Sequence, residues 1–245
     1  PYLSRGLGDV YKRQVEMPPE EVPVQQKRLV RACRDLGKPV IVATQMLESM
    51  VKSPAPTRAE AQDVASAVYD GADAVMLSAE TAAGDYPEEA VGIMDRVIRR
   101  VEQDPVYQQL LEAQHERPQP TAADAITAAA RSVAETIKAA CIVTYTTSGS
   151  TAYRASRERP MPPILGLTAN LRTARRLVLA WGVHTVLTDD VATFGEMVDK
   201  ATSTALNEEL AVEGQALVVT AGVPFGTPGA TNILRVAWVP RARFR

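Results

Sequence analysis

The fold of this chain is decided by an apolar run that ends abruptly in polar residues: Pro39-Val40-Ile41-Val42-Ala43-Thr44-Gln45-Met46-Leu47-Glu48-Ser49-Met50. The β-branched residues in its first half are typical of a strand that is buried on both faces of a parallel sheet. In parallel α/β folds, ligands bind beyond the carboxyl ends of the strands. Thr44 stands at that end and is the first candidate for contact with a substrate. The alternative is a buried threonine that only hydrogen-bonds to a neighbouring strand.

A helix and a second strand follow this run. The motif Thr57-Arg58-Ala59-Glu60 has the T-x-x-E pattern of a capping box, which predicts a helix from there to about Asp70. The apolar residues 74–77 predict the next strand, which again ends in polar residues, among them Ser78 and Glu80. The strand-to-strand spacing of about 35 residues suits a right-handed βαβ unit.

Residues 15–104 therefore read as helix, strand, helix, strand, helix, with polar side chains at the carboxyl end of both strands. This order is typical of a (β/α)8 barrel, which needs eight such units. Because two units are recognisable, we expect residues 15–104 to form the last part of a TIM barrel. Residues 105–120 are rich in Gln, Glu and Pro and predict a linker between domains.

Residues 121–240 alternate between helix and strand, which predicts a doubly wound α/β domain with residues 232–239 as an antiparallel edge strand. The strand 141–145 runs into a turn of small and hydroxyl-bearing residues: Thr146, Thr147, Ser148, Gly149, Ser150 and Thr151. With a helix expected from Ala152, the turn offers N–H and O–H donors to a phosphate, and Arg154 is a candidate for an added charged contact. The turn is not a P-loop, since the GxxxxGK[ST] pattern is absent. The alternative is an ordinary turn rich in small residues.

The composition is that of an ordinary globular protein, with 46% apolar residues, 23% charged residues and a net charge of −2. This charge offers no basic surface for nucleic acid, and no apolar run is long enough to span a bilayer. Without the pattern of a signal peptide, we expect a cytoplasmic protein that binds neither nucleic acid nor membranes. Cys33 and Cys141 are far apart, so neither a disulfide framework nor a cysteine zinc site is indicated.

Several long motifs, in the right order, resemble the pyruvate kinase family, and the resemblance extends over about residues 15–239. The barrel motifs are Ala43-Thr44-Gln45-Met46-Leu47-Glu48-Ser49-Met50, Pro56-Thr57-Arg58-Ala59-Glu60, Asp70-Gly71-Ala72-Asp73 and Met76-Leu77-Ser78-Ala79-Glu80-Thr81. The later motifs are the turn 146–151, Thr220-Ala221-Gly222-Val223-Pro224 and Gly229-Ala230-Thr231-Asn232. The resemblance identifies the chain as the C-terminal part of a family member.

This resemblance implies phosphoryl transfer from phosphoenolpyruvate to ADP, which gives pyruvate and ATP in glycolysis, with Mg²⁺ and K⁺ as cofactors. It implies that the Thr44 hydroxyl lies near the carboxylate of the substrate. Ser78 and Glu80 are expected either in the shell that supports this site or as helix caps. The turn 146–151 resembles the family's effector-phosphate loop, with a sugar phosphate or AMP as ligand. The intact family usually forms homotetramers.

The chain departs from the family before Val15. There the family has an Arg-Gly-Asp-Leu-Gly segment whose aspartate binds Mg²⁺, and further upstream a catalytic lysine and a second metal-binding glutamate. This chain reads Gly8-Asp9-Val10-Tyr11-Lys12-Arg13-Gln14, and neither Asp9 nor Lys12 is in register with those roles. We therefore expect residues 1–14 to be foreign sequence, assign no metal ligand, and expect the truncated chain to be inactive alone.

Two other interpretations remain open. In the first, the chain is a stand-alone module that binds a phosphorylated metabolite, and the barrel residues are only a scaffold. In the second, which ranks last, a different barrel enzyme uses Asp73, Glu80 and Asp85 as a carboxylate cluster. Metal binding or acid–base chemistry at such a cluster would require the three side chains to converge.

Overall fold

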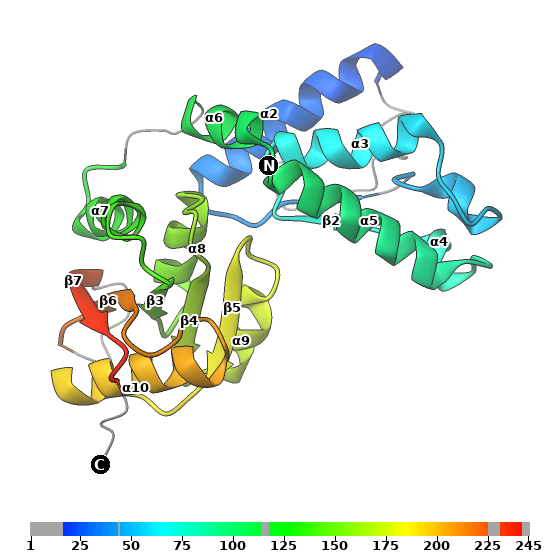
Figure 1. Ribbon diagram of the computed structural model, residues 1–245. Helices are drawn as coiled ribbons and strands as arrows, with labels where there is room; N and C mark the ends of the chain where they lie inside the picture. Colours follow the sequence, from blue (N-terminus) through cyan, green and yellow to red (C-terminus); the bar gives the residue numbers. More distant parts are fainter. Residues whose placement is uncertain (1–16, 44, 114–117, 225–230, 242–245) are drawn as a thin grey trace. The chain divides into compact units, whose positions relative to one another are not determined.

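The computed structural model describes residues 17–43, 45–113, 118–224 and 231–241 (Figure 1). The segment 1–14, expected to be foreign, and Thr44 lie outside these ranges. The chain divides into two compact units, residues 1–115 and 116–245, and the boundary falls inside the predicted linker 105–120.

The first unit combines two short parallel strands with helices. In chain order its elements are η1 (Pro19–Glu21), α2 (Val22–Asp35), β1 (Ile41–Ala43), η2 (Glu48–Val51), α3 (Arg58–Tyr69), β2 (Ala74–Met76), α4 (Ala79–Ala82), α5 (Pro87–Glu102) and α6 (Pro105–Ala113). The strands pair in parallel, with Val42 opposite Val75. This is the predicted βαβ unit, in which α3 connects the two strands.

One face of the two-stranded sheet is covered and the other is open. Val42 packs in a core with Val64 of α3 and Met94 of α5, and Leu47 and Met50 of the turn after β1 are fully buried in the same core. On the other face Ile41 and Met76 are each 42% exposed. The helices therefore cover only one side of β1 and β2.

The helix ends follow the predicted signals. At the start of α3 the Thr57 hydroxyl accepts a hydrogen bond from the Glu60 N–H, and the Glu60 carboxylate accepts one from the Thr57 N–H, which completes the capping box. Gly71, with φ of +91°, follows the helix in the left-handed region that suits glycine.

Helix α6 occupies the first part of the segment predicted as linker. Its Tyr107 is 1% exposed and packs edge-to-face on Tyr69 of α3, with ring centroids 6.1 Å apart. Tyr69 also donates a hydrogen bond of 2.7 Å to Asp104. The polar composition of this segment therefore concealed a helix that is anchored by its buried Tyr107 and Leu111.

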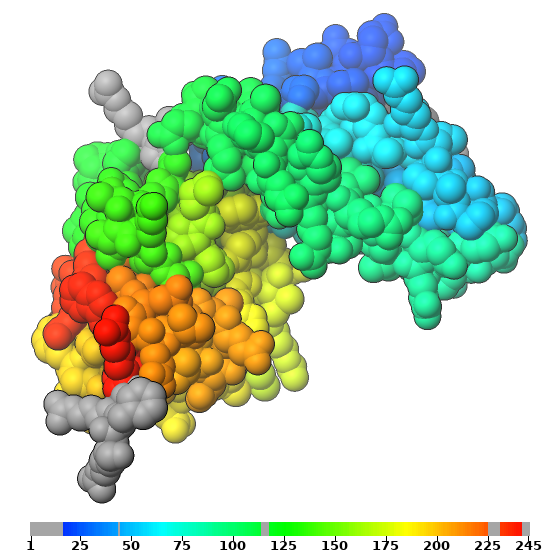
Figure 2. Space-filling model, in the orientation of Figure 1, coloured from blue at the N-terminus to red at the C-terminus, as the bar shows by residue number. Residues whose placement is uncertain are grey.

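The second unit is built on one mixed sheet with the strand order β5-β4-β3-β6-β7. Its elements are α7 (Ala122–Thr136), β3 (Cys141–Tyr145), α8 (Ser150–Arg157), β4 (Ile164–Thr168), α9 (Leu171–Leu177), β5 (Val183–Leu187), α10 (Phe194–Asn207), β6 (Ala216–Gly222) and β7 (Thr231–Trp238). β3 pairs in parallel with β4 and β6, and β7 pairs antiparallel with β6 at the edge, as expected. The residues of β7 lie at the surface in Figure 2, in red.

Helices cover both faces of this sheet, as expected for a doubly wound domain. On one face Val143 packs with Met197 and Ala201 of α10. On the other face Ile142 packs with Ala130 and other residues of α7. Because the first strand of the unit, β3, lies in the middle, its carboxyl end opens between the ends of β4 and β6, which is where such domains bind ligands. Among the helices in the described ranges, none has the length and apolar character that a membrane crossing requires.

Candidate functional site

The first candidate site lies at the carboxyl ends of β1 and β2. Thr44, its principal residue, is outside the described residues. The next residue, Gln45, has φ of +55°, a left-handed conformation that is unfavourable for a residue with a side chain. The buried neighbours Met46 and Leu47 hold the chain in this turn. The turn directs the chain away from the strand into η2.

Glu80 joins the loops that follow the two strands. One of its carboxylate oxygens accepts a hydrogen bond of 3.1 Å from the Leu47 N–H, and the other accepts one of 2.7 Å from the Ser78 N–H. Glu80 is 3% exposed. With both oxygens engaged by backbone groups, the side chain supports the two loops and is not presented to solvent.

Ser78 occupies the N-cap position of α4, but its side chain does not cap the helix. Its carbonyl accepts the Ala82 N–H at 3.0 Å, so only the backbone of Ser78 takes part in the helix start. The residue is exposed. The Ser78 hydroxyl is therefore accessible to a ligand at the carboxyl end of the sheet, where Gln45 also lies.

Glu60 ties the turn after β1 to the start of α3. Its carboxylate accepts hydrogen bonds from the N–H and hydroxyl of Ser49, at 2.7 and 2.6 Å, and from the N–H and hydroxyl of Thr57, at 2.7 and 2.8 Å. Burial acts to raise the pKa of Glu60, but these hydrogen bonds outweigh burial and hold the pKa below its ordinary value. The carboxylate thus stays ionised and fixes the turn.

The carboxylate cluster of the lowest-ranked interpretation does not form. Asp73 accepts a hydrogen bond from the Val40 N–H at the amino end of the strands, Glu80 lies at the carboxyl end, and Asp85 pairs with Lys52. Within the four described ranges, no three His, Cys, Asp or Glu side chains converge as they would around a metal ion. The described residues therefore provide no such cluster for Asp73, Glu80 and Asp85 to form.

The second candidate site is the hydroxyl-rich turn after β3. Helix α8 begins at Ser150, two residues earlier than expected, so Ser150 and Thr151 belong to its first turn. Gly149 precedes it with φ of +92°, and an added Cβ there would lie 3.1 Å from the Tyr153 ring. Only glycine fits this position without strain. The early start places the N–H groups of the first turn of α8 directly after residue 149, and the first of them, that of Ser150, makes a long 3.4 Å hydrogen bond to the Ser148 hydroxyl.

The six predicted residues divide into those that hold the turn and those that remain accessible. Thr146 uses its hydroxyl to accept the Gly149 N–H at 2.9 Å, and the buried Thr151 hydroxyl lies 2.6 Å from that of Thr231. Thr147 and Ser148 are exposed, and the Ser148 hydroxyl lies 3.2 Å from that of Ser150. An anion would therefore meet the hydroxyls of residues 147, 148 and 150.

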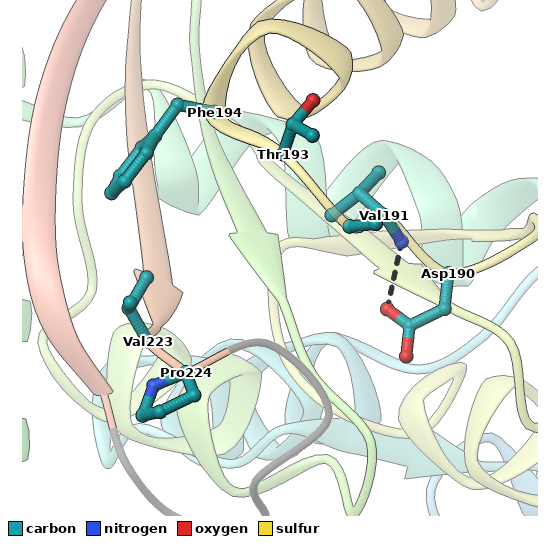
Figure 3. A pocket seen from close by; sticks show the side chains of 7 residues that line it. Asp190, Val191, Thr193, Phe194, Val223 and Pro224 are labelled. Carbon is teal, nitrogen blue, oxygen red and sulfur yellow. Dashed lines mark hydrogen bonds between the residues drawn. The ribbon is translucent and has the colours of Figure 1, made fainter.

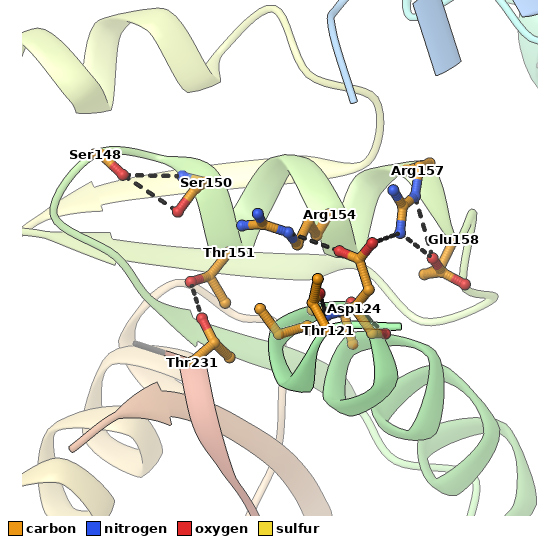
Figure 4. Close-up of polar contacts among 11 residues, drawn as sticks. Thr121, Asp124, Ser148, Ser150, Thr151, Arg154, Arg157, Glu158 and Thr231 are labelled. Carbon is orange, nitrogen blue, oxygen red and sulfur yellow. Dashed lines mark hydrogen bonds and ion pairs between the residues drawn. The ribbon is translucent and has the colours of Figure 1, made fainter. Parts of the chain in front are cut away.

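A buried ion-pair network lies between α8, which follows this turn, and the first turn of α7 (Figure 4). Asp124, in the first turn of α7, is 2% exposed and accepts a hydrogen bond of 2.7 Å from Arg154 Nε. Arg157 Nη2 lies 3.4 Å from the same carboxylate and 3.2 Å from Glu158, which is also buried. Sequence reasoning noted Arg154 but missed Asp124, because nothing in the sequence connects residues 30 positions apart.

An open cavity of about 690 Å³ lies at the same edge of the sheet (Figure 3). It is lined by Asp190, Val191, Ala192, Thr193, Phe194, Val223 and Pro224. Asn232 makes two hydrogen bonds to the Val223 backbone, and its neighbour Thr231 contacts Thr151. Burial raises the pKa of Tyr145, at the end of β3, and the charge of Asp190 raises it further. None of the residues 146–151 lines the cavity, but β7 contacts both regions, through Asn232 at Val223 and Thr231 at Thr151.

The fold and these loops define an α/β protein in which a segment of parallel barrel precedes a doubly wound domain. Two family models match the chain in that order: the pyruvate kinase barrel domain over residues 7–91 and the pyruvate kinase alpha/beta domain over residues 124–237. The chain belongs to the pyruvate kinase family. The predicted fold class and family resemblance are confirmed. The barrel match begins inside the segment 1–14 that was set apart as foreign.

The relatives extend this finding. A pyruvate kinase from Methylorubrum extorquens is 54% identical to this chain, over 93% of this chain and 48% of the relative's length. A pyruvate kinase from Geobacillus stearothermophilus is 48% identical, over 91% of this chain and 38% of the relative's length. The crystal structure of a pyruvate kinase from Cryptosporidium parvum superposes with a TM-score of 0.84 at 38% identity, over 93% of this chain and 45% of that one. The chain spans less than half the length of each.

Proposed function

We propose that this chain supplies the last part of the barrel and the effector domain of a pyruvate kinase. The reaction is phosphoryl transfer from phosphoenolpyruvate to ADP, with pyruvate and ATP as products. The observation that supports it is the match of both pyruvate kinase domain models, at residues 7–91 and 124–237. The proposal includes the Mg²⁺ and K⁺ that the family uses, the homotetramer and a cytoplasmic location.

Phosphoryl transfer depends chiefly on positioning, and the described residues suit that task. In the proposal the Thr44 hydroxyl donates a hydrogen bond to the substrate carboxylate. Glu60 and Glu80 support it indirectly, because they fix the turn that follows residue 44 through backbone N–H groups. Ser78 adds a hydroxyl at the same edge.

We expect Thr44→Ala to lower kcat/KM for phosphoenolpyruvate by about tenfold, because a hydrogen bond to a charged group is lost. The measurement is pyruvate formation with Mg²⁺ and K⁺ in the full-length protein that carries this sequence. The control is Thr81→Ala, whose exposed hydroxyl makes only a long 3.4 Å contact to the Ser78 carbonyl. Equal kinetics for the two variants would contradict the role of Thr44, and the absence of pyruvate formation by the wild type would contradict the function.

We also propose that the turn 146–151 binds the phosphate of a sugar phosphate or AMP effector. The N–H groups of the first turn of α8 and the dipole of that helix favour an anion. The cavity lined by residues 190–194 and 223–224 lies at the same edge of the sheet and is large enough for the remainder of such a ligand. Among the described residues that line the cavity, the one charged side chain is Asp190, which is negative. A second phosphate would therefore be repelled there, whereas Phe194 and Pro224 offer apolar contact.

From this charge distribution we expect AMP, ribose 5-phosphate or glucose 6-phosphate to bind more tightly than fructose 1,6-bisphosphate. Calorimetric titration of the four compounds into the chain tests the expectation, with Ser148→Ala as the variant that should weaken binding. Tighter binding of the bisphosphate would contradict it. Binding that Ser148→Ala leaves unchanged would remove that hydroxyl from the site.

The stand-alone binding module is the second candidate. It is favoured by the second unit, which has its own core and carries both the turn and the cavity. Effector binding together with an absence of pyruvate formation in the full-length protein would decide for this candidate.

A further inference from the structure

The proposed phosphate site contains hydroxyls and N–H groups, but none of its six residues is a cation. Arg154 follows Ser150 by four residues in α8. Residues four apart lie on the same face of a helix, and helical side chains lean toward its N-terminus. The Arg154 side chain is therefore directed toward the first turn of α8, where the phosphate would bind.

Asp124 determines which part of the Arg154 guanidinium faces that turn. The carboxylate engages Nε at 2.7 Å, and in Figure 4 the terminal nitrogens of Arg154 lie on the side of Ser150, away from Asp124. Nη1 is buried and finds no acceptor among the described residues. A charged donor without an acceptor is unfavourable, but because Nη1 is buried, a phosphate would first meet the exposed part of the guanidinium.

We propose that Arg154 is the cationic contact of the phosphate site and that Asp124 is the positioning residue that orients it. The inference rests on the phosphate site proposed above. A guanidinium has five N–H donors, so a carboxylate on Nε leaves the terminal groups for phosphate oxygens. The side chain is 33% exposed, which leaves part of it open to a ligand from solution.

Arg157 provides a matched comparison. It contacts the same Asp124 carboxylate from the same helix, but it lies three residues further from the turn and is also engaged by Glu158. If the network were only structural, Arg154 and Arg157 would be equivalent for ligand binding. If Arg154 binds phosphate, only Arg154 should matter.

The test is calorimetric titration of AMP, ribose 5-phosphate and inorganic phosphate into the 245-residue chain and its variants. We expect Arg154→Gln to weaken binding about tenfold or more, because a charge-assisted hydrogen bond to the phosphate is lost. Arg157→Gln loses no such bond and should change the affinity less than about threefold. Arg154→Lys should restore part of the affinity. The affinity of Arg154→Gln should also fall less steeply with added NaCl, which a purely structural role would not alter.

Equal weakening by both glutamine variants, or none by Arg154→Gln, would overturn the role of Arg154 and leave the phosphate site standing. If the wild type binds none of the three probes, both the site and this role are overturned. Should Arg154→Gln fail to fold, the double variant Asp124→Asn/Arg154→Gln removes both charges of the pair. The same loss of affinity is expected for it, and unchanged affinity would overturn the role.

Discussion

Asp124→Ala is expected to lower the free energy of unfolding of the second unit by about 3 kcal/mol. This value is within the range for removing one partner of a buried ion pair. The reason is that Arg154 and Arg157 would lose the carboxylate they share, while Arg157 stays largely buried. The first turn of α7 would also lose a negative charge that its dipole favours. Urea denaturation followed by tryptophan fluorescence measures the effect, since Trp181 and Trp238 both belong to the second unit.

The matched control is Glu208→Ala, which removes a carboxylate from a more exposed pair with His184 in the same second unit. Such pairs contribute little, so we expect a change below about 0.5 kcal/mol. The loss of unfolding free energy for Asp124→Asn should lie between those of the two alanine variants, because the amide oxygen can still accept a hydrogen bond from Arg154. A loss for Asp124→Ala no larger than that for Glu208→Ala would show that solvent replaces the carboxylate.

Glu80→Ala is expected to lower the free energy of unfolding of the first unit by about 2–3 kcal/mol, because two backbone N–H groups lose their acceptor. One of them belongs to Leu47, whose side chain is fully buried, so water cannot readily replace the carboxylate. Hydrogen exchange of peptides that cover residues 45–51 and 78–82 measures the change. Exchange should become faster in both segments together.

Glu48→Ala is the control for this second variant, since Glu48 lies in the same turn but is exposed. It should leave exchange in both segments near the wild-type rate. Glu80→Gln keeps one acceptor oxygen and should have roughly half the effect. If exchange rises at 45–51 but not at 78–82, Glu80 does not couple the two loops.

The parts of the fold that sequence patterns predicted are those controlled by neighbouring residues. The capping box at Thr57 and the antiparallel last strand both follow from local signals. Helix α6 escaped prediction because its burial depends on Tyr69, far away in the chain. Helix α9 ends at Leu177, although an apolar pattern continues to Trp181.

In the candidate sites, too, features set by neighbouring residues were predicted and features set by distant residues were not. The hydroxyls of the turn after β3 were visible in the sequence, but their division into structural and accessible groups was not. Thr151 is engaged by a residue 80 positions away, and Arg154 by one 30 positions away. Such pairings are made by tertiary packing and leave no local pattern. The role of Thr44 remains a prediction.

The bond from Leu47 to Glu80 also has a consequence for the time course of synthesis. The Leu47 N–H in the turn after β1 donates to the carboxylate of a residue 33 positions later, beyond α3 and β2. On a ribosome that adds about 5–20 residues per second, β1 would leave the exit tunnel seconds before its partner strand and this carboxylate. Until then the turn after β1 lacks this acceptor, so we expect the pairing of β1 with β2 and the Leu47–Glu80 hydrogen bond to form only after residue 80 has emerged.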